Sequence, residues 1–379
     1  MDFSKLDSYI KDTLYSDTTI PGCDIIIKKE HETIFRSQYG YADVNTKTPV
    51  NSDTQYCLYS CTKPVTVAGA MRLVEAGKLD LDSPVSRYLP FFADAFLLKD
   101  GKKVAAKRSI TVRNLFTMTG GFNYCFKTDP INALFENGDD RVSAIDLARA
   151  ALLSPLEYEP GEHFRYSMCH DLLGAVVEAV ADMPFGEYQK KNIFDPLNMQ
   201  KTGFFTTLDT PPTLPPIYGV DADTKEVLPE DSVYHHGLRQ RYESGGAGLI
   251  STVEEYSLFA DTMACGGTST DGYVLLRPET VKMIHSEQLA TFTVNSAFTC
   301  AAGEGYGYGL GVRTLVNKNK GQRSPLGEFG WDGAAGSYVL MDTQNKLSIF
   351  FATHLLRWPA RLGVLHAPIR DLAYDCLEA

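Results

Sequence analysis

The sequence predicts a mixed α/β (α+β) fold, in which an antiparallel sheet is built from both ends of the chain, is flanked by helices, and carries an inserted, mainly helical domain. Runs rich in β-branched and aromatic residues occur near the N-terminus and again after residue 305, whereas the segment between them has helical periodicity and long loops. Strands separated in this way can share one sheet. We therefore assign residues 1–84 and 291–379 to the sheet domain, and residues 85–290 to the inserted helical domain.

The first part of the sheet domain is predicted to contain a helix, a hairpin and a second helix. Apolar residues recur at helical spacing over residues 3–14, with charged residues between them. Residues 23–43 contain two β-rich runs around the polar turn "KKEHE", which indicates a hairpin. Residues 62–79 have helical periodicity and end near a glycine, as helices often do.

The later elements follow from the same patterns. The proline-rich run at 208–219 is expected to be a loop, because proline cannot donate a backbone hydrogen bond. The other expected elements are helices at 142–153, 169–182 and 252–266, β-rich runs at 306–316, 336–344 and 346–356, and a final helix at about 359–376.

Composition and charge exclude several kinds of partner. The 379 residues are 44% hydrophobic and 22% charged, which is typical of a globular protein and enough for two lobes. The net charge of −11 argues against a nucleic-acid partner, because phosphate binding draws on clustered lysine and arginine. The nearest approach to a basic run, residues 99–108, is interpreted as a solvated surface loop.

The N-terminus and the cysteines bear on location. The chain does not begin with a basic segment followed by an apolar core, and nowhere do 18 apolar residues run together. The eight cysteines are scattered and form no C-x-x-C pair. We therefore expect a cytoplasmic protein with reduced cysteines and no membrane association.

Ser60 and Lys63 lie three residues apart where the helix at 62–79 is predicted to start. A serine hydroxyl is a poor nucleophile and needs a base within hydrogen-bonding reach. Residues i and i+3 share one face of a helix, and free N–H groups at a helix start point toward developing negative charge. The residues that follow Lys63 in the predicted helix are mostly apolar and are expected to be buried. A lysine facing such a core costs free energy unless it has a function or a partner. The pair is therefore a candidate nucleophile with its proton partner.

The spacing by itself is weak evidence, because a chain of this length should contain about one S-x-x-K by chance. A second occurs at Ser8 and Lys11, inside the charged N-terminal helix, and is interpreted as a solvated surface pair. From the residues alone, the Ser60 pair is either catalytic or accidental.

Over nearly its whole length the chain resembles the penicillin-recognising serine hydrolases, which comprise class C β-lactamases, D,D-peptidases and family VIII carboxylesterases. The resemblance implies a β-lactamase/transpeptidase-like fold with the active site between the sheet domain and the helical domain. It also implies that Ser60 is the acylated nucleophile and Lys63 its proton partner. The segments that carry the resemblance, in order, are 40–63, 73–90, 110–122, 160–180, 193–205, 244–260 and the glycine-rich end.

The family's second motif begins with a tyrosine, and Tyr166 in "FRYSMCHD" occupies that place. The resemblance implies that its phenol accepts the Ser60 proton and returns it to the leaving group. β-Lactamases usually continue Y-x-N, but here the third residue is Met168, which removes an amide from the substrate site. In this motif the sequence is therefore closest to the family VIII carboxylesterases.

The third motif requires a choice between two places. A literal K-T-G occurs at 201–203, but it follows Tyr166 too soon and is interpreted as a turn. The resemblance places the motif at 331–333, where Trp331 and Gly333 form the W-x-G of family VIII esterases. Trp331 takes the place of the K-T-G lysine, whose positive charge would bind a substrate carboxylate. A tryptophan offers an apolar wall instead, which favours substrates without a carboxylate. The N–H groups of Ser60 and Ala334 are then expected to form the oxyanion hole.

These observations predict a serine hydrolase that cleaves a small carboxylic ester through an acyl-enzyme on Ser60, with deacylation by water or by another alcohol. A β-lactamase or D,D-peptidase acting on amide bonds, and a binding relative without catalysis, remain alternatives. No metal or organic cofactor is expected. The pair His235 and His236 is assigned to a loop that lines the substrate pocket rather than to a metal site, and His354 to a packed position.

Overall fold

The computed structural model describes residues 1–17, 20–136, 141–209, 212–221, 223–224, 226–230, 241–289, 304–318, 322–358 and 362–378. His235 and His236, and the boundary at 290–291, lie outside these residues. The assignment of the two histidines therefore stays a prediction.

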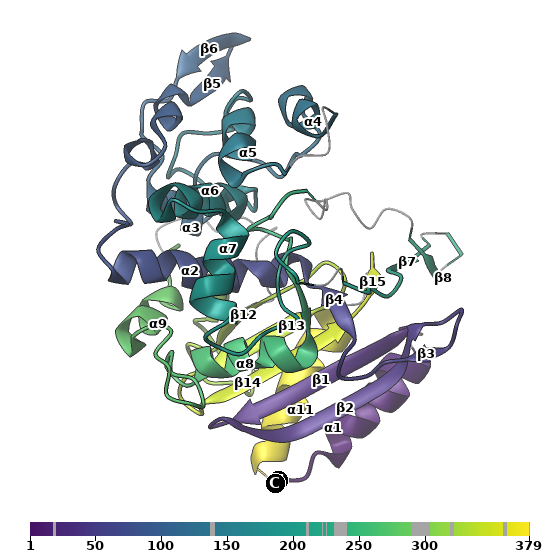
Figure 1. Ribbon diagram of the computed structural model, residues 1–379. Helices are drawn as coiled ribbons and strands as arrows, with labels where there is room; N and C mark the ends of the chain where they lie inside the picture. The colour runs from purple at the N-terminus through teal and green to yellow at the C-terminus, as the bar shows by residue number, and fades with distance from the viewer. Residues whose placement is uncertain are drawn as a thin grey trace.

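A large antiparallel sheet forms the base of the molecule (Figure 1). In the described part of the chain its order is β10-β11-β12-β13-β14-β1-β2-β3, so that the N-terminal strand β1 pairs with β14 from the other end of the chain. The predicted antiparallel sheet built from both termini is confirmed. Its strands are β1 (Gly22–Lys29), β2 (Glu32–Asp43), β3 (Thr48–Pro49), β10 (Tyr306–Tyr308), β11 (Arg313–Leu315), β12 (Phe329–Asp332), β13 (Tyr338–Asp342) and β14 (Leu347–Thr353).

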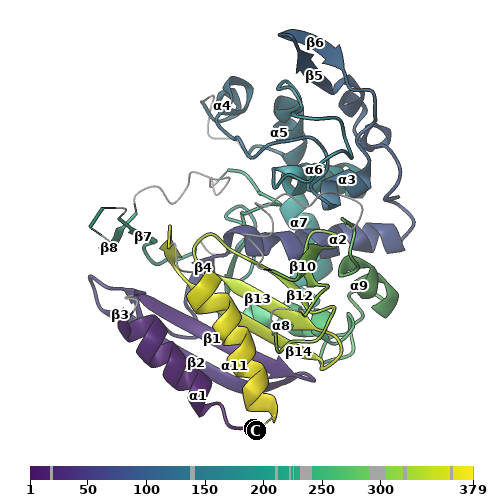
Figure 2. The ribbon, with the colours of Figure 1, turned by 180° about the vertical axis from the view of Figure 1, so that it is seen from behind.

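Helices cover both faces of this sheet. Figure 2 shows the N-terminal helix, α1 (Ser4–Ser8) continued by η1 (Tyr9–Asp17), beside the C-terminal η6 (Leu362–His366) and α11 (Ala367–Glu378) on one face. Ile25 and Ile27 of β1 belong to the apolar core under these helices, whereas Ile26 belongs to the core on the opposite face. Alternate side chains of a strand point to opposite faces, and β1 is buried on both.

The second face of the sheet is covered by α8 (Val253–Ala264), which packs against β14, β1 and β13. The segment assigned to the inserted domain therefore returns to the sheet before residue 290. It is also tied there by β9 (Ile250–Thr252), which pairs with β4 (Gln55–Cys57). The domain division at residues 84 and 290 stays a prediction.

The helical part lies above the sheet, with α2 (Thr62–Glu75) running between the two (Figure 1). α2 ends four residues before the predicted end, because Gly77 takes a left-handed φ of +68° and the chain turns. The remaining helices are η2 (Tyr59–Cys61), η3 (Val85–Arg87), η4 (Pro90–Asp94), α3 (Val112–Phe116), α4 (Asp129–Glu136), α5 (Ala144–Ala151), α6 (Cys169–Ala181), α7 (Phe185–Gln189), η5 (Lys190–Phe194) and α9 (Pro278–Ile284).

Short strands also occur outside the large sheet. The predicted surface loop at 99–108 is instead part of a hairpin, β5 (Phe96–Lys99) and β6 (Lys102–Ala105), although its lysines are exposed as expected. A small sheet joins β7 (Tyr218–Val220), β8 (Val227–Pro229) and β15 (Leu355–Leu356). Among the described residues, no helix has the length and apolarity needed to cross a bilayer.

Candidate active site

Ser60 lies in the one-turn helix η2, immediately before α2. Tyr59, the residue before it, has a φ of +47°, a left-handed conformation that costs a non-glycine residue roughly 1–2 kcal/mol. Hydrogen bonds hold this turn: Thr62 Oγ1 donates to Tyr59 O (2.6 Å), and Leu58 N donates to Leu249 O (2.9 Å). The fold thus maintains a strained turn that presents Ser60, half-buried, at the start of α2.

The side chains of Lys63 and Tyr166 meet at the Ser60 hydroxyl. Tyr166 Oη lies 2.6 Å from Ser60 Oγ, and Lys63 Nζ lies 3.1 Å from the same atom. Lys63 is fully buried, and its Nζ also donates to Gly246 O (2.7 Å) and to Tyr124 Oη (3.4 Å). An ammonium group has three protons and here has three acceptors, so the buried lysine is fully hydrogen-bonded.

An aromatic wall borders this group of side chains. The Tyr124 and Tyr166 rings stack with centroids 5.4 Å apart, and the Trp331 and Tyr166 rings stack with centroids 5.7 Å apart. Tyr308 contacts the Trp331 ring edge-on at 5.4 Å. Lys63 Nζ lies 4.6 Å from the Tyr166 ring centroid, within the range of a cation–π interaction. The structure therefore brings Trp331 next to the Ser60, Lys63 and Tyr166 side chains.

The turn after β12 lies against the segment that precedes Ser60. Ser337 Oγ donates to Leu58 O (2.9 Å), and a Cβ atom at Gly333 would collide with both of these oxygen atoms. Glycine at position 333 therefore permits the close approach of the two segments. Ala334 is exposed in this turn, next to Gly333, and its predicted part in the oxyanion hole stays a prediction.

Met168 lies at the N-terminal end of α6 and is only 4% exposed. Its backbone N–H donates to Asn123 O (3.1 Å), and its side chain lines a small cavity together with Phe122 and Ile131. The residue thus packs within the helical part, and its predicted contact with substrate stays a prediction.

The literal K-T-G forms a structural turn. Lys201 is half-exposed and pairs with Asp53 (2.5 Å). The hydroxyl of Thr202 donates to Glu255 (2.7 Å), and Gly203 pairs with Ile250 through the backbone. These contacts fasten the turn to β9 and α8, which agrees with the interpretation of 201–203 as structural.

Two residues near Lys63, Tyr124 and Asp171, were not predicted from the sequence to belong to this group. Tyr124 comes two residues after the segment "ITVRNLFTMTGGF", and among twenty tyrosines its position carries no distinguishing signal. Burial raises the pKa of its phenol well above the usual range, and the neighbouring Tyr166 and Asp171 add to this effect. Asp171 is fully buried on α6 and accepts hydrogen bonds from Tyr242, Ser244 and Gly246. An aspartate inside an apolar helix was a usable signal, because buried carboxylates require partners.

His354, and the one cluster of metal-ligating side chains among the described residues, do not form part of this arrangement. His354 is buried between the rings of Tyr56 and Tyr218, and burial lowers its pKa to about 4, so it is a packed residue. Among the described residues, one group has metal-ligating atoms close together: His31, Asp261 and Cys265. His31 Nδ1 and Asp261 Oδ2 are 2.8 Å apart, and this pair joins the β1–β2 turn to α8. We interpret these contacts as structural, because they connect the β1–β2 hairpin to α8.

The fold and this arrangement define a class: α/β proteins of the β-lactamase/transpeptidase type. A family model described as Beta-lactamase matches residues 6–373, so the chain belongs to the Beta-lactamase family. Protein Rv1367c of Mycobacterium tuberculosis is 29% identical over 95% of this chain and 89% of its own length. Esterase EstB of Burkholderia gladioli is 26% identical over 98% of this chain and 95% of EstB.

Among solved structures, EstCE1, described as a hydrolase with promiscuous acyltransferase activity, superposes with a TM-score of 0.80 and 27% identity over 98% of both chains. The predicted fold and the predicted family are confirmed. This chain is a β-lactamase-related serine hydrolase.

Proposed function

We propose that this protein hydrolyses carboxylic esters through an acyl-enzyme formed on Ser60. The observation that carries the proposal is the convergence of two proton-handling groups on one hydroxyl, with Tyr166 Oη and Lys63 Nζ at 2.6 Å and 3.1 Å from Ser60 Oγ. A serine becomes a nucleophile when such a partner takes its proton.

In the acylation step, Ser60 Oγ bonds to the ester carbonyl carbon while its proton passes to the Tyr166 oxygen, which reacts as a phenolate stabilised by the Lys63 ammonium. The carbonyl electron pair moves onto the carbonyl oxygen, which accepts hydrogen bonds from the N–H groups of Ser60 and Ala334. The bond to the alcohol oxygen then breaks, and Tyr166 returns the proton to it. The products are a free alcohol and an ester of Ser60.

In the deacylation step, water gives a proton to Tyr166 and adds to the acyl carbon. The bond to Ser60 Oγ breaks, the proton returns to this oxygen, and a carboxylic acid leaves. A second alcohol can take the place of water and would then leave as a new ester. The printed description of EstCE1 as a hydrolase with acyltransferase activity supports including this branch.

The choice of an ester over a lactam or a D-alanyl peptide depends on two positions. Trp331 stands where β-lactamases carry a lysine, and it supplies an apolar wall but no positive charge for a substrate carboxylate. Met168 stands where an asparagine would hold the amide of a lactam substrate. The similarity to an esterase, EstB, over almost the whole chain supports the same choice.

The first test is hydrolysis of p-nitrophenyl butyrate by the wild type and by Ser60→Ala, with mass spectrometry to identify the acylated residue. We expect turnover by the wild type, an acyl group on Ser60, and no turnover by the variant. Equal activity in both proteins would exclude Ser60 as the nucleophile. Nitrocefin hydrolysis faster than ester hydrolysis would favour the β-lactamase alternative, and a wild type that no fluorophosphonate labels would favour a binding protein without catalysis.

A further inference from the structure

The buried carboxylate of Asp171 lies behind the proposed site, on the helix α6 that packs against α2. Three groups of the segment 242–246 donate to its Oδ1 atom: Ser244 Oγ at 2.6 Å, Tyr242 Oη at 3.1 Å and Gly246 N at 3.4 Å. The carboxylate therefore binds this segment at both of its ends. Burying a charged carboxylate costs free energy that an apolar residue would not, so these hydrogen bonds are needed to offset it.

The same segment contacts Lys63. Gly246 O accepts the 2.7 Å hydrogen bond from Lys63 Nζ, so the peptide unit that receives the lysine belongs to a segment held by Asp171. A Cβ atom at Gly246 would lie 2.5 Å from Asp171 Oδ2 and 3.3 Å from Tyr124 Oη. Position 246 therefore requires glycine, since these groups and the lysine converge on one small volume.

The second oxygen of the carboxylate, Oδ2, is buried and has no hydrogen-bond partner among the described residues. Burial raises the pKa of Asp171, whereas the hydrogen bond from Ser244 and the positive charge of Lys63 lower it. Other titratable groups around it are the phenols of Tyr124 and Tyr242, the Cys169 thiol, whose pKa burial raises to about 11, and the adjacent His170, whose pKa burial lowers to about 3. The positive charge that faces Asp171 is therefore that of Lys63.

We propose that Asp171 is a positioning residue for the Ser60 reaction: its carboxylate holds the segment 242–246 so that Gly246 O receives Lys63, and its negative charge keeps Lys63 in the ammonium form. The inference rests on the proposed function, in which that ammonium stabilises the Tyr166 phenolate. Asp171 touches neither the substrate nor the reacting atoms, and it acts through Lys63.

The structure offers a variant that separates the two roles. In Asp171→Asn, the side-chain oxygen can keep the position of Oδ1 and its three hydrogen bonds, while the amide nitrogen takes the place of the unpartnered Oδ2. The segment thus stays held, but the negative charge is gone. A carboxylate favours the protonated form of a neighbouring amine, so its loss should move the alkaline limb of the kcat/KM profile to lower pH.

We would measure kcat/KM for p-nitrophenyl butyrate from pH 5 to 10 in the wild type, in Asp171→Asn and in Glu178→Gln. The last variant is the matched control, because Glu178 is a second buried acid on α6 whose partners are Arg141 and the backbone of Ala144 and Phe185. We expect the alkaline limb of Asp171→Asn to lie lower by about one pH unit or more, with a melting temperature close to that of the wild type. The limb of Glu178→Gln should not move.

A profile of Asp171→Asn that superposes on that of the wild type would overturn the inference alone. A wild type that is not acylated on Ser60 would overturn the proposed function, and the inference with it. Should Asp171→Asn not fold, Ser244→Ala provides the second test. This substitution removes one hydrogen bond from the carboxylate, so Asp171 should take up a proton at higher pH. The acidic limb of the kcat/KM profile should therefore move to higher pH. An acidic limb at the wild-type position would contradict the proposal.

Discussion

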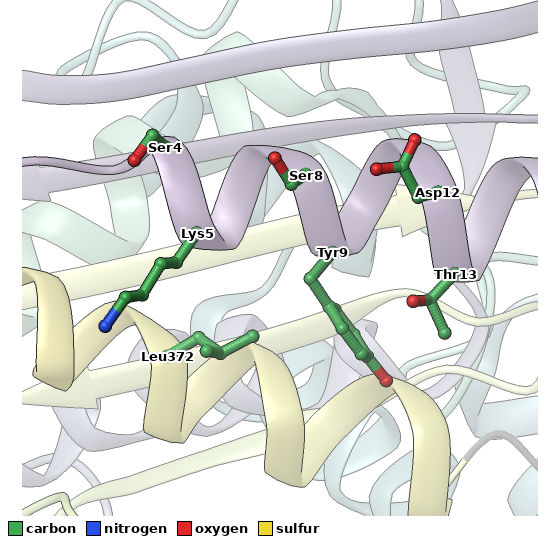
Figure 3. Close-up of a pocket in the computed structure, with 7 residues that line it drawn as sticks. All are labelled: Ser4, Lys5, Ser8, Tyr9, Asp12, Thr13 and Leu372. Carbon is green, nitrogen blue, oxygen red and sulfur yellow. The ribbon is translucent and has the colours of Figure 1, made fainter.

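The chain contains two S-x-x-K sequences, and the structure gives them opposite surroundings. Ser8 and Lys11 are both exposed on the N-terminal helix, where Ser8 is among the residues that line a surface pocket, together with Tyr9 and Leu372 of α11 (Figure 3). At the second pair, Lys63 is 0% exposed and its Nζ lies 3.1 Å from Ser60 Oγ. The same spacing thus places one pair in water and the other in a closed, hydrogen-bonded site.

The difference shows what an S-x-x-K sequence needs, beyond its spacing, to form a hydrogen-bonded site. Contacts of an exposed lysine add little stability in water, and Lys11 lies in a π-helical segment that does not align residues three apart as an α-helix does. Burial restricts Lys63 to one arrangement, because each of its protons must find an acceptor. The acceptors come from other parts of the chain, at Tyr124 and Gly246. Four sets of substitutions test this comparison.

The largest effect is expected from the two serines. Ser60→Ala should lower kcat/KM for p-nitrophenyl butyrate by roughly 10⁴-fold or more, because the nucleophile is removed. Ser8→Ala should leave the rate unchanged within twofold. Steady-state assays of both variants suffice, and a large loss in Ser8→Ala would erase the distinction between the two pairs.

The lysines should differ nearly as much. Lys63→Met keeps the length and apolar stem of the side chain but removes the amine, and it should lower kcat by roughly 10²–10⁴-fold. Lys11→Met should have no effect on kcat. Circular dichroism melting of both variants controls for folding, and a folded Lys63→Met with wild-type kcat would remove the lysine from the mechanism.

The two stacked tyrosines sharpen the comparison within the site. Tyr166→Phe should lower kcat by roughly 10²-fold or more, because its oxygen lies 2.6 Å from Ser60 Oγ and is proposed to carry the proton. Tyr124→Phe removes the longer, 3.4 Å contact with Lys63 and should cost about tenfold or less. Stopped-flow measurement of the acylation phase would compare them, and a reversed order would assign the proton transfer to Tyr124.

The smallest effect is expected at the literal K-T-G. Lys201→Ala should leave kcat/KM within twofold and should lower the free energy of unfolding by about 1 kcal/mol or less, because the pair with Asp53 is largely exposed. Urea denaturation and the ester assay measure the two quantities. A tenfold loss of activity without loss of stability would bring this segment into the site.

The sequence by itself determined the elements that depend on local patterns. The two β-rich runs around a polar turn, the periodicity of α2 and α6, and the β-rich runs near the C-terminus predict β1, β2, α2, α6, β13 and β14 without knowledge of the rest of the chain. The proximity of Ser60 and Lys63 is local as well, since three residues of helix place both side chains on one face. The order of motifs also predicted the family, because the resemblance extends over most of the chain.

The tertiary structure alone decided the features that depend on contacts distant in sequence. α8 packs on the sheet although its sequence continues the helical segment, Tyr124 stacks on Tyr166, and Asp171 holds the peptide that receives Lys63. Nothing in the sequence distinguishes Tyr124 from the other tyrosines, and the apolar helix around Asp171 indicates that its carboxylate needs partners without indicating which segment supplies them. Hydrogen bonding in a buried site depends on which segments meet there, and that is set by the packing of the whole fold rather than by any short stretch of sequence.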